Sequence, residues 1–348
     1  MTRLKSRQAS KLLNVLSGIV EAVPPIWLMR QAGRYLPEYR ALRSKAGSFL
    51  DLCYNPDFAA EVTLQPIRRY DFDAAILFAD ILLIPHALGQ NLSFEAGEGP
   101  RLYPVVAAKD LEAFRKRNIH ETLKPVYETV SRVRASLAPE KALIGFAGAP
   151  WTVATYMLAG GPNDEPPALR KRWYDDPAFI EGLIDVLSDA TVDYLVAQID
   201  AGADAVQLFD SWAGGMPEAA TRALSLEPLR KIATRVKERR PATPVILFPK
   251  GVGTLIGDYA AIDGCDAVGI DFATPWDAAR RAIAPHAAAQ GGLDPMLVVK
   301  GGAAMEEAAK RLVDTFRGAP FIFNLGHGLT PDTPPENVAR LVEIVRGG

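Results

Sequence analysis

Cysteine and histidine are scarce in this sequence of 348 residues, which contains two cysteines and four histidines. Cys53 and Cys265 are far apart, so no disulfide framework is expected, and a reducing compartment such as the cytoplasm fits this usage. Two cysteines are also too few for a structural zinc knuckle. The histidines show none of the close spacing that metal ligands use, and they stand at His86, His120, His286 and His327.

Long apolar runs and an excess of charge of one sign are also missing. No stretch approaches the ~18 apolar residues of a membrane span. Residues 1–24 begin with basic side chains, and Asn14 and Glu21 interrupt the apolar stretch that follows. We therefore interpret them as an N-terminal helical extension with a short amphipathic helix, not as a signal peptide. The net charge of −2 argues against a nucleic-acid partner and favours a small molecule.

Short apolar runs recur along the chain, and most are followed at once by a polar residue or a glycine. Their content of Ala, Val, Ile and Phe without polar alternation is typical of parallel strands buried on both faces. The runs are 26–29, 74–78, 142–146, 205–209, 245–248, 267–270, 287–289 and 321–323. Helical patterns with charged faces lie between many of them, at 111–137, 177–200, 227–239 and 304–316.

Eight strands that alternate with helices predict an α/β fold, a single-domain (β/α)₈ barrel that spans residues 1–348. The run at 287–289 is the weakest of the eight, and a doubly wound open sheet is the alternative fold. In a barrel, functional side chains follow the strands at the carboxyl-terminal rim. Polar residues do follow the predicted strands, namely Arg30, Asp80, Asp210, Ser211, Lys250, Asp271, Asp294 and His327.

The segment from Trp27 to Arg40 carries the strongest functional signal. Between Arg30 and Lys45 there are five cationic side chains and one anionic side chain, on a chain whose net charge is close to zero. Guanidinium groups bind carboxylates and phosphates through paired hydrogen bonds. The segment lacks the glycines of a nucleotide-binding loop. It predicts an anion-binding site, although solvated arginines around a helix start are the simpler alternative.

Four further positions combine a reactive side chain with a strand end or a helix start. Asp80 has large apolar neighbours, and nearby arginines are expected to keep it ionised. It either accepts from N–H donors or balances a developing cation, or it is an N-cap or a salt-bridge partner. Tyr156 lies one helical turn after Thr152 and is either a hydrogen-bond donor or a core residue. Ser211 lacks a histidine nearby in sequence, so substrate hydrogen bonding fits it better than a nucleophilic triad. His327, between two glycines, could donate to an anion, titrate near neutrality or be structural.

These residues lie in five motifs that resemble the uroporphyrinogen decarboxylase family along nearly the whole chain. The order and length of the motifs make the resemblance specific. They read PIWLMRQAGRYLPEYR from Pro25, DAAILFADIL from Asp73, GFAGAPWT from Gly145, QLFDSWAG from Gln207 and NLGHG from Asn324.

The resemblance implies a single-domain barrel, usually a homodimer, that works without cofactor or metal. The cytoplasmic location is expected because no membrane span or signal peptide is predicted. It implies a carboxy-lyase of haem and chlorophyll biosynthesis that removes carbon dioxide from all four acetate arms of a cyclic tetrapyrrole, uroporphyrinogen III, and gives coproporphyrinogen III. The implied catalytic residues are Asp80, Arg30 and Tyr156. The implied substrate-binding residues are Arg30, Gln31, Ala32, Gly33, Arg34, Phe49, Asp80, Tyr156, Ser211 and His327. Trp212 stands where some members of the family carry histidine, which puts an acid–base role for that position in doubt.

The chemistry of the residues agrees with this implication. A substrate with eight carboxylates matches an arginine-rich mouth, and protonation of a pyrrole ring creates a cation that Asp80 would stabilise. The proton donor stays open between Arg30, water and a substrate carboxyl. Two other functions are possible alternatives. One is a zinc- and corrinoid-dependent methyltransferase with a similar barrel, which needs a His/Cys cluster that the two isolated cysteines do not offer. The other is a non-catalytic tetrapyrrole-binding protein.

Overall fold

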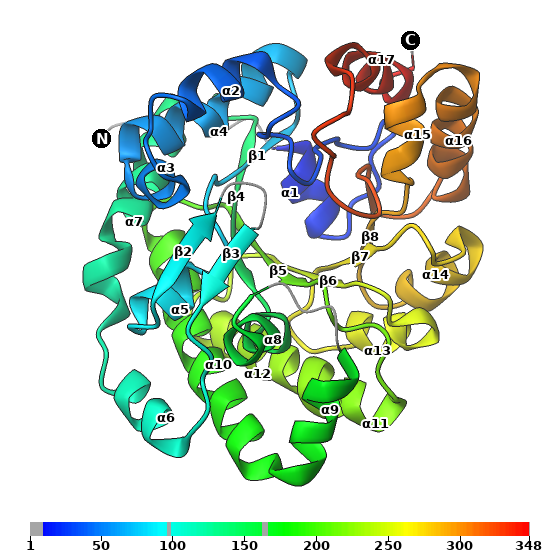
Figure 1. Cartoon of the computed structure of the whole chain (residues 1–348). Helices are drawn as coiled ribbons and strands as arrows, with labels where there is room; N and C mark the ends of the chain where they lie inside the picture. The colour runs from blue at the N-terminus through cyan, green and yellow to red at the C-terminus, as the bar shows by residue number, and fades with distance from the viewer. Residues whose placement is uncertain (1–9, 96–98, 162–165, 348) are drawn as a thin grey trace, which may run out of the picture.

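A barrel of parallel strands surrounded by helices forms the centre of the protein, as the computed structural model shows for residues 10–95, 99–161 and 166–347 (Figure 1). The barrel strands run in the order β1-β4-β5-β6-β7-β8-β9, and every neighbouring pair is parallel. Their bounds are β1 Ala74–Ile76, β4 Ala142–Gly148, β5 Ala205–Asp210, β6 Val245–Pro249, β7 Ala267–Ile270, β8 Ala288–Gly291 and β9 Phe321–Ile322. The predicted barrel is thereby confirmed, including the weak strand near residue 288.

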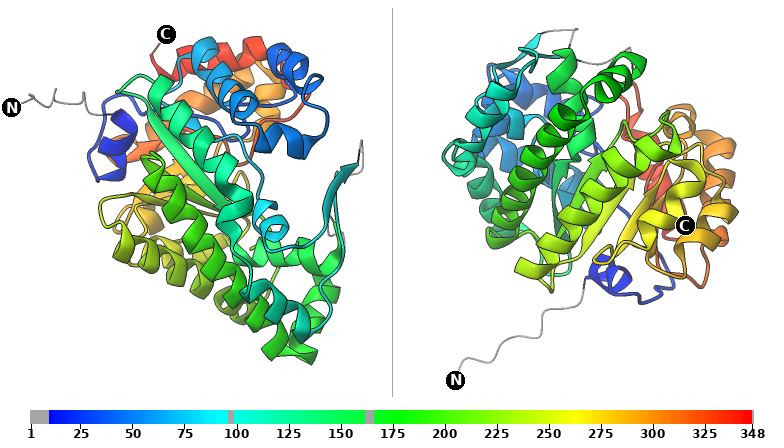
Figure 2. Two further views of the ribbon diagram at one scale, coloured as in Figure 1. Left: turned by 90° about the vertical axis from the view of Figure 1, so that its left-hand side faces the viewer. Right: turned by 90° about the horizontal axis from the view of Figure 1, so that it is seen from below.

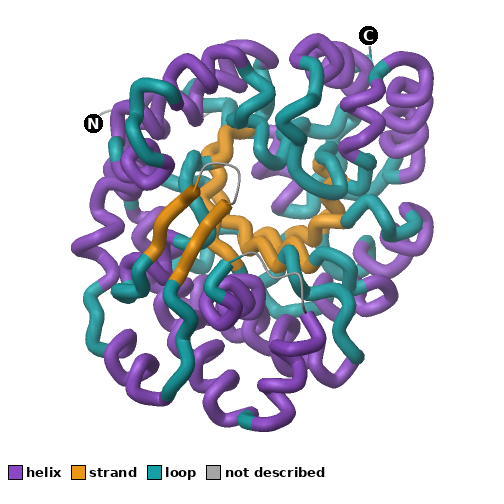
Figure 3. The backbone as a smooth tube through the Cα atoms, in the orientation of Figure 1, coloured by secondary structure: helices purple, strands orange, loops and turns teal. Residues whose placement is uncertain are grey.

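The first predicted strand, 26–29, is not a regular strand. Only Ile26 forms a bridge, with Phe323, and its carbonyl accepts from the backbone N–H of Asp73. The segment thus lies between β9 and β1 and closes the ring, which Figure 3 shows as a curved row of strands completed by a loop. It does not continue as a strand because the chain turns at Met29 and Arg30 to form the arginine-rich loop.

Helices pack around the outside of the barrel (Figure 1). They are α1 Lys11–Leu16, α2 Pro37–Arg43, α3 Phe49–Tyr54, α4 Pro56–Tyr70, α5 Leu83–Ala87, α6 Ala108–Arg115, α7 Ile119–Ser136, α8 Pro150–Ala159, α9 Pro166–Asp175, α10 Pro177–Asp200, α11 Glu218–Thr221, α12 Glu227–Arg239, α13 Ile256–Ala260, α14 Trp276–Ile283, α15 Pro295–Lys300, α16 Gly302–Thr315 and α17 Pro335–Val345. The helix predicted over 111–137 is in fact two, because the chain turns at residues 116–118 between α6 and α7.

At the amino-terminal end of the barrel, an aspartate before each of three alternate strands bonds the backbone of the neighbouring segment. Asp73, Asp204 and Asp266 each immediately precede a strand, and each accepts the backbone N–H of the neighbouring strand start, at 2.8 Å, 2.8 Å and 2.7 Å. Asp204 and Asp266 are also paired with Arg134 and Lys237. A carboxylate that satisfies a strand N–H and a cation together stabilises the strand register.

Polar side chains cross the interior of the barrel in one chain of hydrogen bonds. The indole of the fully buried Trp27 donates to Gln290, whose amide donates to Gln207, both at 3.0 Å. Nearer the carboxyl-terminal end, Phe146, Phe209 and Phe248 form edge-to-face contacts. The barrel is therefore filled, and an open volume for a ligand must lie above the aromatic layer.

An antiparallel hairpin, β2 Leu92–Glu95 and β3 Gly99–Leu102, is an element that the sequence patterns did not predict. It stands out from the body of the protein, whereas α1 lies at the opposite end of the barrel (Figure 2). α1 is shorter than the predicted amphipathic stretch, because the chain turns at Ser17 and Gly18. No helix among the described residues is long and apolar enough to cross a membrane.

Candidate active site

Arg30 lies on a loop whose backbone is strained. Its φ of 61° is in the left-handed region, which non-glycine residues seldom adopt except where the surrounding structure enforces it. The carbon stem of Arg30 lies against Gly328, where a side-chain carbon would come within 2.4 Å of Arg30 Cδ. Gly328 therefore provides the space that the arginine side chain occupies.

The rest of the RQAGR loop is held by Gln31 and Tyr35. The buried Gln31 amide accepts from the N–H of Leu28 and donates to the carbonyl of Ala74, and the Tyr35 hydroxyl donates to the Gln31 carbonyl. The Gln31 side chain thus joins the loop to β1. Ala32 and Gly33 are half-buried, and the Arg34 side chain is exposed.

The two guanidinium groups of this loop are not held in ion pairs within the described residues. Within the described part of the chain, neither Arg30 nor Arg34 has a carboxylate at ion-pairing distance. Arg40, by contrast, donates to the carbonyls of Arg34 and Tyr35 and so supports the loop. The loop therefore presents two cations without an ion pair among the described residues, and Arg30 lies close enough to Asp80 to influence its pKa.

Asp80 follows β1 and is half-buried near Arg30. One carboxylate oxygen accepts from the N–H of Leu82 at 2.8 Å, and the other has no partner among the described residues. Burial raises the pKa of Asp80 to about 6, although the Leu82 N–H and the Arg30 charge oppose the shift. At neutral pH the group is still ionised, as the sequence predicted, but burial outweighs the arginine that was expected to dominate.

His327 presents a hydrogen-bond donor to the same end of the barrel. Its Nδ1 accepts from the N–H of Gly328 at 2.8 Å, which leaves the proton on Nε2. Burial, Arg30 and Lys250 lower the pKa of His327 to about 4, so the ring stays neutral near pH 7. Of the alternatives left by the sequence, titration near neutrality is therefore wrong.

The glycines beside His327 act through close approach, not through positive φ. A side chain at Gly326 would strike the backbone of Phe272 at 2.1 Å, and a side chain at Gly328 would strike Arg30. Neither has a positive φ. The motif therefore seats His327 between the end of β7 and the arginine loop.

Phe49 belongs to an aromatic wall beside Asp80. Its ring lies 6.0 Å from Phe78, two residues before Asp80, and 4.7 Å from Phe94 of the hairpin. Tyr39 contacts Phe78 from α2. An aromatic wall next to a carboxylate suits the face of a large conjugated or pyrrolic ring.

Tyr156 and Ser211 are linked through Thr152, although no hydrogen bond joins them to each other. The Thr152 hydroxyl donates to Asp210 at 2.6 Å and accepts from the N–H of Trp212 at 3.0 Å, which ties α8 to the loop after β5. Tyr156, one turn after Thr152, and Ser211, between the two bonded residues, are both half-buried. The structure thus connects the two elements that carry them.

Sequence reasoning underestimated two groups at this end. The sequence identifies Lys250 only as a residue after a strand, and it identifies the aromatic layer of Phe146, Phe209 and Phe248 only as part of the predicted strands. A signal was present in the sequence, because each of these phenylalanines is the last residue of one of the apolar runs at 142–146, 205–209 and 245–248.

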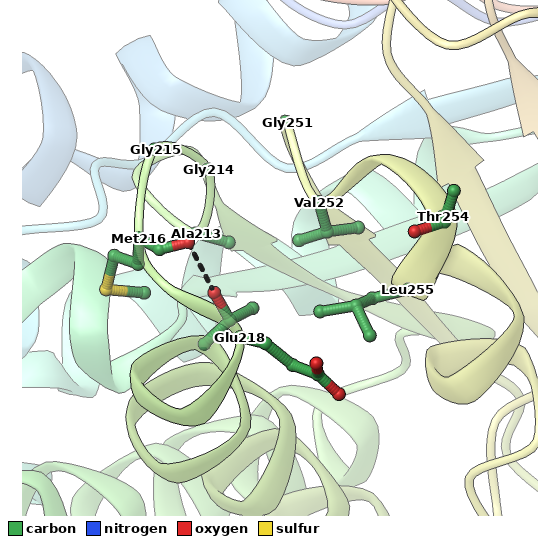
Figure 4. Close-up of a pocket in the computed structure, with 10 residues that line it drawn as sticks. Ala213, Gly214, Gly215, Met216, Glu218, Gly251, Val252, Thr254 and Leu255 are labelled. Atoms are coloured by element: carbon green, nitrogen blue, oxygen red, sulfur yellow. Dashed lines mark hydrogen bonds between the residues drawn. The ribbon is translucent and has the colours of Figure 1, made fainter.

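A cavity of about 190 Å³ lies beside the site, between the loops after β5 and β6 (Figure 4). Small and apolar residues line most of it, and its one charged side chain is Glu218. It does not match a polyanion. Among the described residues, no group of three or more His, Cys, Asp or Glu could hold a metal ion.

The sequence profile of the uroporphyrinogen decarboxylase family matches residues 7–348. The chain belongs to this family. It is 52% identical to "Uroporphyrinogen decarboxylase" of Rhodospirillum rubrum over 341 residues, which covers 98% of each chain. It is 55% identical to the protein of the same name from Sinorhizobium fredii over 338 residues, 97% of each chain. The predicted family is therefore confirmed.

Solved structures with similar folds include a methyltransferase from Methanosarcina mazei, with a TM-score of 0.76, 20% identity and 97% coverage of both chains. A B12-independent methionine synthase from Shewanella is similar with a TM-score of 0.55, 11% identity, and coverage of 84% of this chain and 87% of the other. At these identities the likeness concerns the barrel fold alone.

Proposed function

We propose that this member of the uroporphyrinogen decarboxylase family removes carbon dioxide from the four acetate arms of uroporphyrinogen III and releases coproporphyrinogen III. The observation that carries the proposal is the half-buried Asp80 carboxylate, with one oxygen unbonded among the described residues, near Arg30 and on the same rim as other cations that form no ion pair within the described chain. A cyclic tetrapyrrole offers N–H donors at its centre and carboxylates at its edge, which is the complement of this arrangement.

In the proposed complex, Asp80 accepts the inward-pointing pyrrole N–H groups. Arg30, Arg34 and the Nε2–H of His327 bind carboxylate arms, and Tyr156 and Ser211 donate to others. Phe49 lies against the ring system. The backbone of Gln31, Ala32 and Gly33 follows the substrate edge, because the Gln31 side chain is engaged in the fold.

The chemistry needs a place for the electrons of the breaking C–C bond. Protonation of a pyrrole ring carbon gives a cation, the acetate carboxylate leaves as carbon dioxide, and the bonding pair moves into the ring. Protonation of the exocyclic carbon then leaves a methyl group, and loss of the first proton restores the pyrrole. The fixed charge of Asp80 stabilises the cationic intermediate, and no cofactor takes part in this scheme.

We further propose a homodimer, as the family resemblance implies, that is located in the cytoplasm. The two cysteines are buried and unpaired, which supports a reducing compartment. Sedimentation equilibrium at micromolar protein measures the oligomeric state, and a monomer there would overturn the dimer.

The decisive experiment treats purified protein with chelator and fresh uroporphyrinogen III, without added cofactor. The products are oxidised and separated by the number of carboxyl groups. A ladder from eight to four carboxyls supports the proposal. Tight binding with unchanged octacarboxylate would instead select a tetrapyrrole-binding protein, and activity that depends on zinc and a corrinoid would select a methyltransferase.

A further inference from the structure

Lys250 is a half-buried cation without an ion-pair partner among the described residues. It follows β6, and its backbone N–H donates to the carbonyl of Asp210 at 3.0 Å, so the ladder between β5 and β6 continues through it. The barrel therefore holds the backbone of Lys250 in place.

The side chain faces the interior of the barrel mouth. Phe209 and Phe248 are paired in register on neighbouring strands, and their ring centroids lie 6.0 Å apart inside the barrel. The Phe248 ring is also 6.5 Å from the ring of His327. Side chains alternate along a strand, so Lys250, two residues after Phe248, lies on the same face, one layer nearer the mouth.

The intervening residues confirm the alternation. Asp210, which pairs with Pro249, points outward, where its carboxylate accepts from Thr152 and Ser225. Ser211 and Lys250 directly follow these strands, and because the Lys250 N–H still bonds the Asp210 carbonyl, continued alternation places both side chains on the inward face.

The carboxylates at the ends of the two strands that flank β6 are already engaged. Asp210 is occupied by the two hydroxyls on its outer side, and Asp271 accepts from the backbone N–H groups of Gly251, Ala273 and Thr274. Neither forms an ion pair with Lys250. A half-buried cation without an ion-pair partner among the described residues favours an external anion.

Two further contacts bring a second donor and a second cation to the same place. His327 lies over Phe248 and carries its proton on Nε2, and Arg30 packs on Gly328, the residue after His327. The influence of Arg30 and Lys250 on the His327 pKa is consistent with this proximity.

We propose that Lys250 and the Nε2–H of His327, flanked by Arg30, form one carboxylate-binding subsite for an arm of the tetrapyrrole, and that Lys250 determines affinity for that arm. The subsite rests on the proposed function, because the anion that it binds is a substrate carboxylate. Both acetate and propionate arms have this chemistry, and they are distinguished by experiment.

The test compares the steady-state kinetics of Lys250→Met with the wild type on uroporphyrinogen III. Loss of one charge-assisted hydrogen bond raises KM about 10-fold or more, whereas kcat changes by less than about threefold. Lys250→Arg keeps the charge and restores most of the affinity. The matched control is Lys231→Met, an exposed lysine paired with Asp185, which leaves KM unchanged.

Binding titrations separate the outcomes. Porphyrin fluorescence measures the affinity of wild type and Lys250→Met for uroporphyrin III and coproporphyrin III. If Lys250→Met weakens the binding of both porphyrins equally, the subsite holds a propionate. If it weakens the binding of uroporphyrin alone, the subsite holds an acetate. The subsite is overturned if a folded Lys250→Met variant has a KM and porphyrin affinities within about twofold of wild type. Lys250→Gln is the second variant if Lys250→Met does not fold. A wild type without decarboxylation would overturn the proposed function, whereas the titrations would still test Lys250.

Discussion

The two ends of the barrel use the same residue types in opposite ways. At the amino-terminal end, aspartates and cations neutralise one another: Asp204 pairs with Arg134, Asp266 with Lys237, and each aspartate also accepts a strand N–H. At the carboxyl-terminal end, Arg30 and Lys250 have no carboxylate partner in the part of the chain described. Charges that form ion pairs within the chain stabilise the fold, and charges without an ion-pair partner are available to bind a ligand.

The difference also appears in the aspartates themselves. Asp266 has a strand N–H and a lysine as partners, whereas Asp80 has one N–H, a free oxygen and a raised pKa. A carboxylate kept in an environment that disfavours its charge costs stability, which is acceptable where function requires it. Four experiments would break or sharpen the comparison.

The largest expected effect is that of Asp80→Asn. Because the amide removes the charge next to the proposed pyrrole cation, kcat falls on the order of 100–1,000-fold while the protein still folds. The measurement is single-turnover decarboxylation with porphyrins separated by carboxyl count. Asp294→Asn is a matched control, since Asp294 also follows a barrel strand and accepts an N–H two residues on, that of Met296, at 2.9 Å. Near-normal turnover of Asp80→Asn would remove this charge from the mechanism.

Next is the arginine loop. Arg30→Met lowers kcat/KM about 30–100-fold, because an arm carboxylate loses a paired guanidinium. Gly328→Ala takes the space of the Arg30 stem and leaves the charge in place, so it lowers kcat/KM by a smaller factor of about 10. The control is Gly257→Ala, where the added carbon meets only ordinary contacts at 3.4 Å. If Gly328→Ala were fully active, the position of Arg30 would not matter.

At the other end of the barrel, Asp266→Ala is expected to affect stability and not chemistry. It leaves the Val245 N–H and Lys237 without their partner, which lowers the free energy of unfolding by about 2–3 kcal/mol. Urea denaturation measures this, and kcat of the folded fraction stays within twofold of wild type. Asp193→Ala, from an exposed pair with Arg239, costs less than about 1 kcal/mol. A large loss of kcat in Asp266→Ala would contradict the division between the ends.

The smallest effect is a gain in stability. The pKa of Asp80 is about 6 in the folded protein and 3.8 ordinarily, so ionisation of Asp80 destabilises the fold above pH 6. Asp80→Asn therefore raises the free energy of unfolding at pH 7 by about 1–2 kcal/mol, and the gain disappears as the pH falls from 6 to 4. Denaturation at pH 7, 5 and 4 measures it, and a gain that is independent of pH would contradict the charge as its cause. The kcat/KM of the wild type falls through the same range, as the carboxylate is protonated.

Much of this protein was readable in the sequence. Apolar runs without polar alternation predicted the parallel strands, because strands buried on both faces need apolar side chains on both. The residues that follow those runs predicted the rim, since parallel strands end on one edge. Asp80 and His327 were found in this way, and both lie at that end of the barrel with Arg30.

Other features had no local signal. The aspartates of the amino-terminal end precede apolar strands at 73, 204 and 266, but the N–H groups that they bind are on the neighbouring segment of the ring, and the cations paired with Asp204 and Asp266 are on helices. The hairpin of β2 and β3 was missed because its short strands include Gly99 and Pro100, which are uncommon within strands.

The sequence by itself determined the family, the barrel and the set of residues that could act on an anion, because these depend on residue types and their order along the chain. Only the tertiary structure decided which charges remain open. Whether Asp80 titrates near 6, which nitrogen of His327 carries its proton, and whether Lys250 has a partner depend on burial and on neighbours distant in sequence. Electrostatic free energies depend on distance and desolvation, and folding alone sets both.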